Sequence, residues 1–144
     1  MSAGVMDYLL GKNRKRPQSK VLRGEVDRTA LLIDSLKFTQ KYMSGCLSFL
    51  EQDVDENIKH EIMDLFESTV FAGLNFEQFN ILWVEHRDKN RLELNFVIPQ
   101  VELKSGKRLQ SYYDRADRKR FNSFQNYVNT KYKFADPHDP SRTQ

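Results

Sequence analysis

The sequence contains little that would place the protein outside the cell or in a membrane. Its single cysteine, Cys46, has no partner within the chain, which excludes a disulfide scaffold and fits a reducing compartment. No apolar run approaches the roughly 20 residues that a membrane span requires. The first four residues lack the basic start and apolar stretch of a secretory signal. We therefore expect a cytoplasmic protein without a membrane span.

Several familiar catalytic motifs are also missing. The chain has no Gly-rich phosphate loop, nucleophile elbow, paired-cysteine motif or His-Glu-x-x-His zinc helix, and no internal repeat. Its 144 residues suit one domain, because domains commonly run to about 100–150 residues. Ten Phe, six Tyr and one Trp argue against a disordered chain. We therefore expect a single folded domain over residues 1–144.

The charged residues are segregated into blocks, although the net charge is only +3. Residues 1–24 hold six Lys and Arg side chains, residues 104–120 hold seven, and residues 51–67 between them carry seven acidic ones. One basic block alone indicates no more than a solvated surface, but two blocks, the second with interleaved aromatics, favour a polyanion such as nucleic acid. The candidate DNA contacts are Lys12, Arg14, Lys15, Arg16, Lys104, Lys107, Arg108, Tyr112, Tyr113, Arg115 and Arg118.

The hydrophobic pattern predicts an α+β fold. Residues 11–25, rich in Gly, Pro and charge, indicate a loop, and the apolar period of residues 58–69 indicates the clearest helix. The order of helices and strands leaves little room for parallel crossovers, which favours an antiparallel sheet flanked by helices. The predicted elements are helices over 4–10, 29–36, from Asp53 or Asp55 to Gly73 and from Arg115 or Arg118 to Tyr132, and strands over 42–50, 79–86 and 91–98, followed by a small hairpin over 101–110.

The hairpin formed by the last two strands places three candidate metal ligands on one face. Alternation along residues 91–98 puts Glu93 and Asn95 on the same side, and an even-numbered turn sets His86 opposite Arg91 and thus on that side too. One imidazole nitrogen, one carboxylate and one amide oxygen suit a hard divalent cation such as Mg²⁺ or Mn²⁺. A half-exposed strand shows the same alternation without a metal, so the residues alone leave both interpretations open.

Tyr8 is a second candidate for chemistry. It lies between Asp7 and the basic loop that follows Gly11. A catalytic nucleophile and a half-buried packing residue are both consistent with a tyrosine in this position.

The stretch from residue 80 to residue 99 closely resembles the metal-site hairpin of plasmid mobilisation relaxases. These enzymes are DNA strand transferases that nick a plasmid at its transfer origin. The spacing from His86 to Glu93 to Asn95 is that of the subgroup in which a His–Glu–Asn set replaces an all-histidine metal cluster. Residues 5–11 are similar to the segment with the family's nucleophilic tyrosine, and the similarity continues through residues 101–117.

The resemblance implies a relaxase-like fold and a metal-assisted reaction on one DNA strand. It implies that Tyr8 attacks the phosphorus at the nic site and forms a 5′-phosphotyrosyl link, with Mg²⁺ or Mn²⁺ held by His86, Glu93 and Asn95. The implied partners are single-stranded or supercoiled plasmid DNA at the transfer origin, and accessory mobilisation proteins. The implied process is plasmid mobilisation or conjugative transfer, in the cytoplasm of a bacterium.

The sequence departs from the family's pattern at its start. Relaxases normally begin with a β-strand and a Gly-rich turn before the tyrosine segment, whereas this sequence starts at Met1. We therefore expect a relaxase domain that is N-terminally truncated and lacks its first strand, with an exposed sheet edge and Tyr8 held less firmly relative to the metal. A non-catalytic DNA-binding remnant is the alternative. A third hypothesis is an adaptor that docks a basic partner on the acidic helix face formed by Asp55, Glu56, Asp64 and Glu67.

Overall fold

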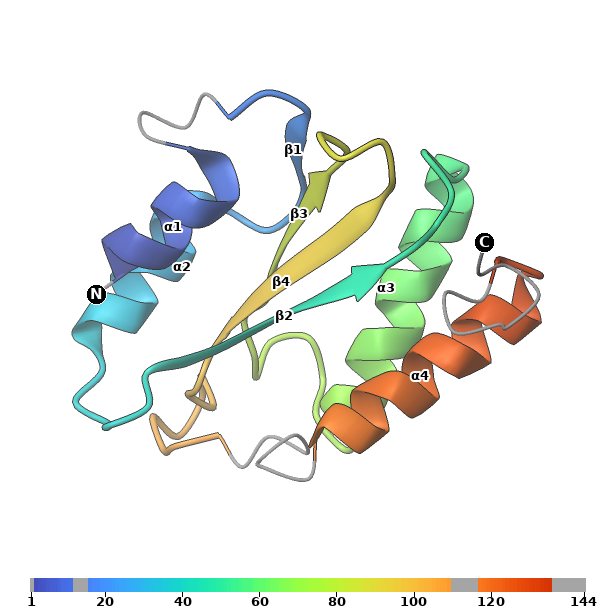
Figure 1. Ribbon diagram of the computed structural model, residues 1–144. Helices are drawn as coiled ribbons and strands as arrows, with labels where there is room; N and C mark the ends of the chain where they lie inside the picture. The colour runs from blue at the N-terminus through green and yellow to red at the C-terminus, as the bar shows by residue number, and fades with distance from the viewer. Residues whose placement is uncertain (1, 12–15, 110–116, 136–144) are drawn as a thin grey trace.

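The computed structural model describes residues 2–11, 16–109 and 117–135, with the backbone but not the side chains of residues 117–121 (Figure 1). Four helices and four strands lie in this part of the chain. In chain order they are α1 (Ser2–Leu10), β1 (Ser19–Arg23), α2 (Val26–Ser35), β2 (Tyr42–Ser48), α3 (Glu56–Val70), β3 (Leu82–His86), β4 (Glu93–Pro99) and α4 (Asp117–Lys131). None of the described helices is both long and apolar enough to cross a bilayer.

The four strands form one antiparallel sheet in the order β1-β3-β4-β2. β3 and β4 make the central hairpin, while β1 and β2 lie at its two sides. The hairpin register pairs Leu82 with Val97 and His86 with Glu93. This arrangement confirms the α+β fold and the antiparallel sheet that the sequence predicts, and it puts His86 and Glu93 at the turn end of the hairpin.

Helices cover both faces of the sheet, because side chains alternate between the faces along each strand. α1 and α2 lie on one face, and α3 and α4 lie on the other (Figure 1). The core on the first face contains Met6, Leu9, Leu10, Ile33, Leu82, Val84 and Val97. The core on the second face is aromatic, with the Phe66 ring centroid 5.2 Å from that of Trp83 and 4.6 Å from that of Phe96. α1 is therefore packed directly on the hairpin face that carries His86.

The strand β1 lies within residues 11–25, where composition predicts a loop. Lys20 and Arg23 are the charged residues of β1 itself. An edge strand tolerates such side chains when they can pair with groups on other elements. Arg23 binds α3 through Asp64 at 2.8 Å and Glu67 at 2.9 Å. The loop prediction was wrong because these partners are distant in sequence. The same two ion pairs use part of the acidic helix face within the fold, so the adaptor hypothesis gains no support.

The remaining elements match their predictions within three residues at each end. The exception is the small hairpin predicted over residues 101–110. In its described part, residues 101–109, there is a single β-bridge between Val101 and Arg108. Pro99 ends β4 directly before it, since proline lacks the N–H that the strand ladder needs. The predicted turn was therefore present, but the two short strands were not.

A buried lysine anchors α3 to the end of β3. Lys59 is 1% exposed, and its ammonium contacts Glu85 of β3, Asp53 at 2.7 Å and Glu56 at 2.9 Å. Burial alone would lower the pKa of Lys59, but its hydrogen bonds to the three carboxylates raise it, so the ammonium stays charged. Arg87 adds ion pairs to Glu85 at 3.2 Å and to Asp53 at 3.0 Å. We call these five residues the Lys59 network.

We expect Lys59→Met to lower the free energy of unfolding by about 3 kcal/mol, because Glu85 is 2% exposed and loses a partner that it cannot replace with water. Urea denaturation followed by circular dichroism measures this change. Lys89→Met, in the exposed hairpin turn, is the matched control and should change stability by less than about 0.5 kcal/mol. A loss of less than about 1 kcal/mol for Lys59→Met would contradict the anchoring role of the network.

Candidate functional site

The three predicted metal ligands lie at the turn end of the β3–β4 hairpin. β3 ends at His86 and β4 begins at Glu93, directly across from it, while Asn95 lies opposite Val84. Directly opposed residues of an antiparallel pair point to the same face, so the three side chains share the face that α1 covers. His86 is 1% exposed and Asn95 is 5% exposed. The fold therefore brings the imidazole, the carboxylate and the amide to one end of one face.

The hairpin register differs from the predicted one by two positions. We expected His86 opposite Arg91, whereas residues 87–92 separate the strands and His86 lies opposite Glu93. The predicted pair was wrong because the connection is longer than the polar turn that the sequence indicated. A shift of two positions leaves every side chain on its face, since the side-chain period of a strand is two. The shared face is therefore as predicted.

Both ring nitrogens of His86 are engaged within the protein. Nε2 lies 2.6 Å from the carbonyl oxygen of Leu9 in α1, and Nδ1 lies 3.1 Å from the side-chain nitrogen of Asn95. Because a carbonyl oxygen only accepts, Nε2 carries the hydrogen and donates it, which leaves Nδ1 as an acceptor. A backbone carbonyl that holds one nitrogen orients the other, which is the arrangement typical of metal-binding histidines.

Tyr8 lies on the same helix as the carbonyl that holds His86. α1 buries Met6, Leu9 and Leu10 against the sheet, and Tyr8 is 58% exposed beside them. The Tyr8 ring meets the His86 ring edge-on, with the ring centroids 6.3 Å apart. This exposure argues against a core packing role for the tyrosine, and it leaves the ring accessible to a large substrate.

The predicted DNA contacts whose side chains the structure describes lie at opposite ends of the sheet. Arg16 lies beside Tyr8, with its guanidinium carbon 5.5 Å from the ring centroid. Lys104, Lys107 and Arg108 follow the far end of β4, a strand of seven residues and therefore about 20 Å long. The fold thus brings Arg16 to the candidate site, but not these three. The other predicted contacts lie outside the described side chains; they are Lys12, Arg14, Lys15, Tyr112, Tyr113, Arg115 and Arg118.

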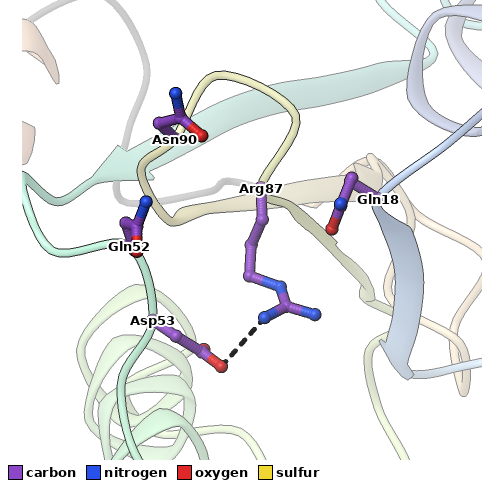
Figure 2. Close-up of a pocket in the computed structure, with 5 residues that line it drawn as sticks. All are labelled: Gln18, Gln52, Asp53, Arg87 and Asn90. Carbon is purple, nitrogen blue, oxygen red and sulfur yellow. Dashed lines mark hydrogen bonds and ion pairs between the residues drawn. The ribbon is translucent and has the colours of Figure 1, made fainter.

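A polar pocket of about 230 Å³ lies beside the hairpin turn (Figure 2). Figure 2 shows Arg87 reaching from the end of β3 to its ion-pair partner Asp53. The backbone N–H of Arg87 also donates to the carbonyl oxygen of Gln18, 3.0 Å away and next to β1. These contacts fix the turn to two neighbouring segments. The pocket is lined by Gln18, Gln52, Asp53, Arg87 and Asn90.

Comparison with known protein families identifies the family of the chain. The model of the relaxase family described as MobA/VirD2-like, nuclease domain, matches residues 16–134. The chain belongs to this relaxase family. The match to the family model begins after Tyr8. The assignment of that tyrosine to the candidate site therefore depends on the geometry of α1.

Two curated relatives extend the similarity over nearly the whole chain. The relaxase domain is 52% identical over 142 residues to cryptic plasmid protein C of Neisseria gonorrhoeae and 49% identical over 138 residues to the DNA relaxase MbeA of Escherichia coli. The matches cover 99% and 96% of this chain, which spans 69% of the length of the first relative and 27% of the second. No solved structure matches the chain significantly.

The donor atoms of this relaxase domain fit a divalent cation. The amide of Asn95, turned over, presents its oxygen in place of its nitrogen beside Nδ1 of His86. Glu93 adds a carboxylate on the same face, and such a mixed nitrogen and oxygen set suits Mg²⁺ or Mn²⁺. Among the residues that the structure describes, no three His, Cys, Asp or Glu side chains gather as a metal site. The candidate site therefore has three donors only when the amide oxygen of Asn95 is counted with His86 and Glu93.

Two features of the candidate site have no signal in the sequence. One is the Leu9 carbonyl, since a backbone group is the same at every position. The other is Cys46 on β2, which lies opposite Asn95 with its sulfur 3.8 Å from the Glu93 carboxylate. Burial of the sulfur, followed by the nearby charge of Glu93, raises the pKa of the Cys46 thiol to about 11. In the metal-free protein the thiol therefore stays protonated at neutral pH.

We expect NMR of the metal-free protein to show His86 as the Nε2–H tautomer, because the Leu9 carbonyl accepts that hydrogen. Long-range hydrogen–nitrogen correlation spectra of histidine-labelled protein at mildly alkaline pH distinguish the two tautomers, and His86→Ala assigns the signal. The Nδ1–H tautomer would be incompatible with the hydrogen bond from His86 to α1.

Proposed function

We propose that the chain is a relaxase nuclease domain, over residues 1–144, that nicks one strand of plasmid DNA at a transfer origin. The proposal depends above all on the junction of α1 with β3. There Tyr8 is exposed beside His86, and Nε2 of His86 donates a hydrogen bond to the carbonyl of the next residue, Leu9. Family membership supports the same function, and one relative bears the name DNA relaxase.

The proposed reaction exchanges one phosphodiester for another. The hydroxyl oxygen of Tyr8 attacks the phosphorus at the nic site, and the bond from phosphorus to the 3′ oxygen breaks. The 5′ phosphate stays on the tyrosine, the phenol releases its proton, and the 3′ oxygen takes up a proton. No nucleotide is consumed, and the free 3′-hydroxyl can later attack the phosphotyrosyl link and rejoin the strand.

His86, Glu93 and Asn95 are the residues that would hold the metal ion. When bound there, Mg²⁺ or Mn²⁺ stabilises the negative charge that builds on the oxygens of the scissile phosphate. The chain itself supplies orientation, since the Leu9 carbonyl keeps Nδ1 of His86 directed toward Asn95. The burial of His86 and Asn95 excludes water from that side of the reaction.

The proposed substrate is a single-stranded segment of supercoiled plasmid DNA at the transfer origin. The exposed ring of Tyr8 and the neighbouring charge of Arg16 suit such a strand, because unpaired bases stack on rings and phosphates bind cations. Tyr112, Tyr113 and the basic residues near them are proposed contacts of the flanking strand. Accessory mobilisation proteins that open the origin are the proposed partners, in a bacterial cytoplasm.

We expect the full chain to form a protein–DNA adduct, visible on a denaturing gel, with origin DNA and Mg²⁺ or Mn²⁺. Tyr8→Phe should abolish the adduct because the attacking oxygen is gone, and should change single-strand binding by less than about threefold. Tyr127→Phe is the matched control, since Tyr127 is 53% exposed but lies on α4. An adduct that persists in Tyr8→Phe would move the nucleophile to another tyrosine.

We expect Glu93→Ala to lower metal-dependent nicking about 100-fold, because the metal loses its carboxylate, while single-strand binding is retained. A chelator should cause a comparable loss in the unmodified chain. Glu61→Ala removes an exposed carboxylate from α3 and should leave nicking unchanged. Nicking that survives Glu93→Ala would show that the metal ligands have been wrongly assigned.

A further inference from the structure

Arg16 is held over the proposed nucleophile by several contacts at once. Its guanidinium carbon lies 5.5 Å from the centroid of the Tyr8 ring. Nη1 donates to the backbone carbonyl oxygen of Tyr8 at 2.6 Å, and Nε donates to Asp88 at 2.8 Å. Asp88 belongs to the β3–β4 turn, two residues beyond His86. The arginine therefore links the helix that carries the tyrosine to the hairpin that carries the candidate metal ligands.

The chain makes room for Arg16 at Gly11. α1 ends there, and the backbone N–H of Arg16 returns to the carbonyl oxygen of Leu10 at 2.6 Å. A Cβ atom at Gly11 would lie 2.8 Å from the backbone nitrogen of Arg16 and 2.9 Å from its Cβ. Gly11 also has a φ of +79°, a conformation that side chains disfavour. The position of Arg16 is thus set by the backbone conformation at Gly11 and by the hydrogen bond to Leu10.

The charge and the open donor of Arg16 suit a phosphate. The hydrogen bond to Asp88 raises the pKa of Arg16, so the guanidinium stays charged. The side chain is 19% exposed, and Nη2 has no hydrogen-bond partner among the residues that the structure describes. A guanidinium held through two of its nitrogens, with donor capacity left on the third, is pre-organised for an anionic oxygen.

We propose that Arg16 is a catalytic residue that binds a non-bridging oxygen of the scissile phosphate, with Asp88 as its positioning residue. This role rests on the proposed function of Tyr8. As the Tyr8 oxygen bonds to phosphorus and the bond to the 3′ oxygen breaks, negative charge gathers on the non-bridging oxygens and the guanidinium stabilises it. The phenol proton is released, the 3′ oxygen takes up a proton, and Arg16 keeps its own protons throughout.

A purely structural role for Arg16 makes a different prediction. An arginine beside the last turn of a helix also satisfies carbonyl groups and offsets the helix dipole. In that case, removal of Arg16 and loss of one phosphate charge would weaken DNA binding independently. If Arg16 contacts one phosphate directly, the losses of binding free energy caused by removing Arg16 and by neutralising that phosphate are not additive.

The test is a double-mutant cycle that compares binding of single-stranded origin DNA with and without Arg16. In the DNA, one phosphate at a time is replaced by an uncharged methylphosphonate. The protein is the full chain with Tyr8→Phe, which prevents cleavage, and a chelator is present so that no metal contributes. The position of the scissile phosphate is first determined by nicking of natural DNA. Neutralising that phosphate should weaken binding about 10-fold when Arg16 is present. With Arg16→Ala the same neutralisation should weaken binding less than about twofold.

Nicking of natural DNA gives a second readout. Arg16→Ala should lower the nicking rate constant about 100-fold. Arg16→Lys should lower it about 10-fold, because lysine keeps the positive charge but lacks the several fixed donors of the planar guanidinium. Asp88→Asn should lower the rate constant with little change in KM. Arg28→Ala, at an exposed arginine of α2, is the matched control and should leave both readouts unchanged.

The outcomes separate the two proposals. Absence of an adduct in the unmodified chain would overturn the proposed function of Tyr8. Adducts accompanied by equal weakening with and without Arg16, or by coupling to a different phosphate, would overturn the role of Arg16 and leave the proposed function standing.

Discussion

The hydrogen bond from His86 to the carbonyl oxygen of Leu9 is the contact on which the rest of the site depends. It joins α1 to β3, and it leaves Nδ1 of His86 as the nitrogen that faces Asn95. Because Tyr8 precedes Leu9 in the chain, the same bond sets the distance between the tyrosine and the candidate metal ligands. A shift of α1 would therefore disturb the nucleophile and the imidazole together, which makes them one mechanical unit.

That unit is supported from both faces of the sheet. On the first face, α1 is fixed by its buried leucines and by the pair of hydrogen bonds from Ser2 to Asp34 of α2. On the opposite face, the Lys59 network includes Glu85, the residue next to His86. Such support restricts the rotamers of a functional side chain, and functional sites need that restriction more than they need additional stability. The hairpin end is thus held from both faces of the sheet where the chemistry is proposed, while Tyr8 is exposed.

Much of the fold could be predicted because its helices and strands follow local hydrophobic periods. The shared face of His86, Glu93 and Asn95 also followed from the period of a strand, even though the exact pair did not. The strand β1 could not be predicted, because the partners of its charged residues lie on a distant helix. The burial of Lys59 and the return of Arg16 to Tyr8 were hidden for the same reason: both depend on contacts that only the folded chain brings together.

We propose that the metal ligands and the nucleophile belong to one site. Fluorine NMR of the full chain labelled with fluorotyrosine, titrated with paramagnetic Mn²⁺, tests this without DNA, and Tyr8→Phe and Tyr127→Phe assign the two signals. The Tyr8 signal should broaden first, since its ring centroid lies 6.3 Å from that of His86, and Glu93→Ala should prevent the broadening. A Tyr8 signal that stays sharp, or a Tyr127 signal that broadens before it, would show that the tyrosine and the metal do not share a site.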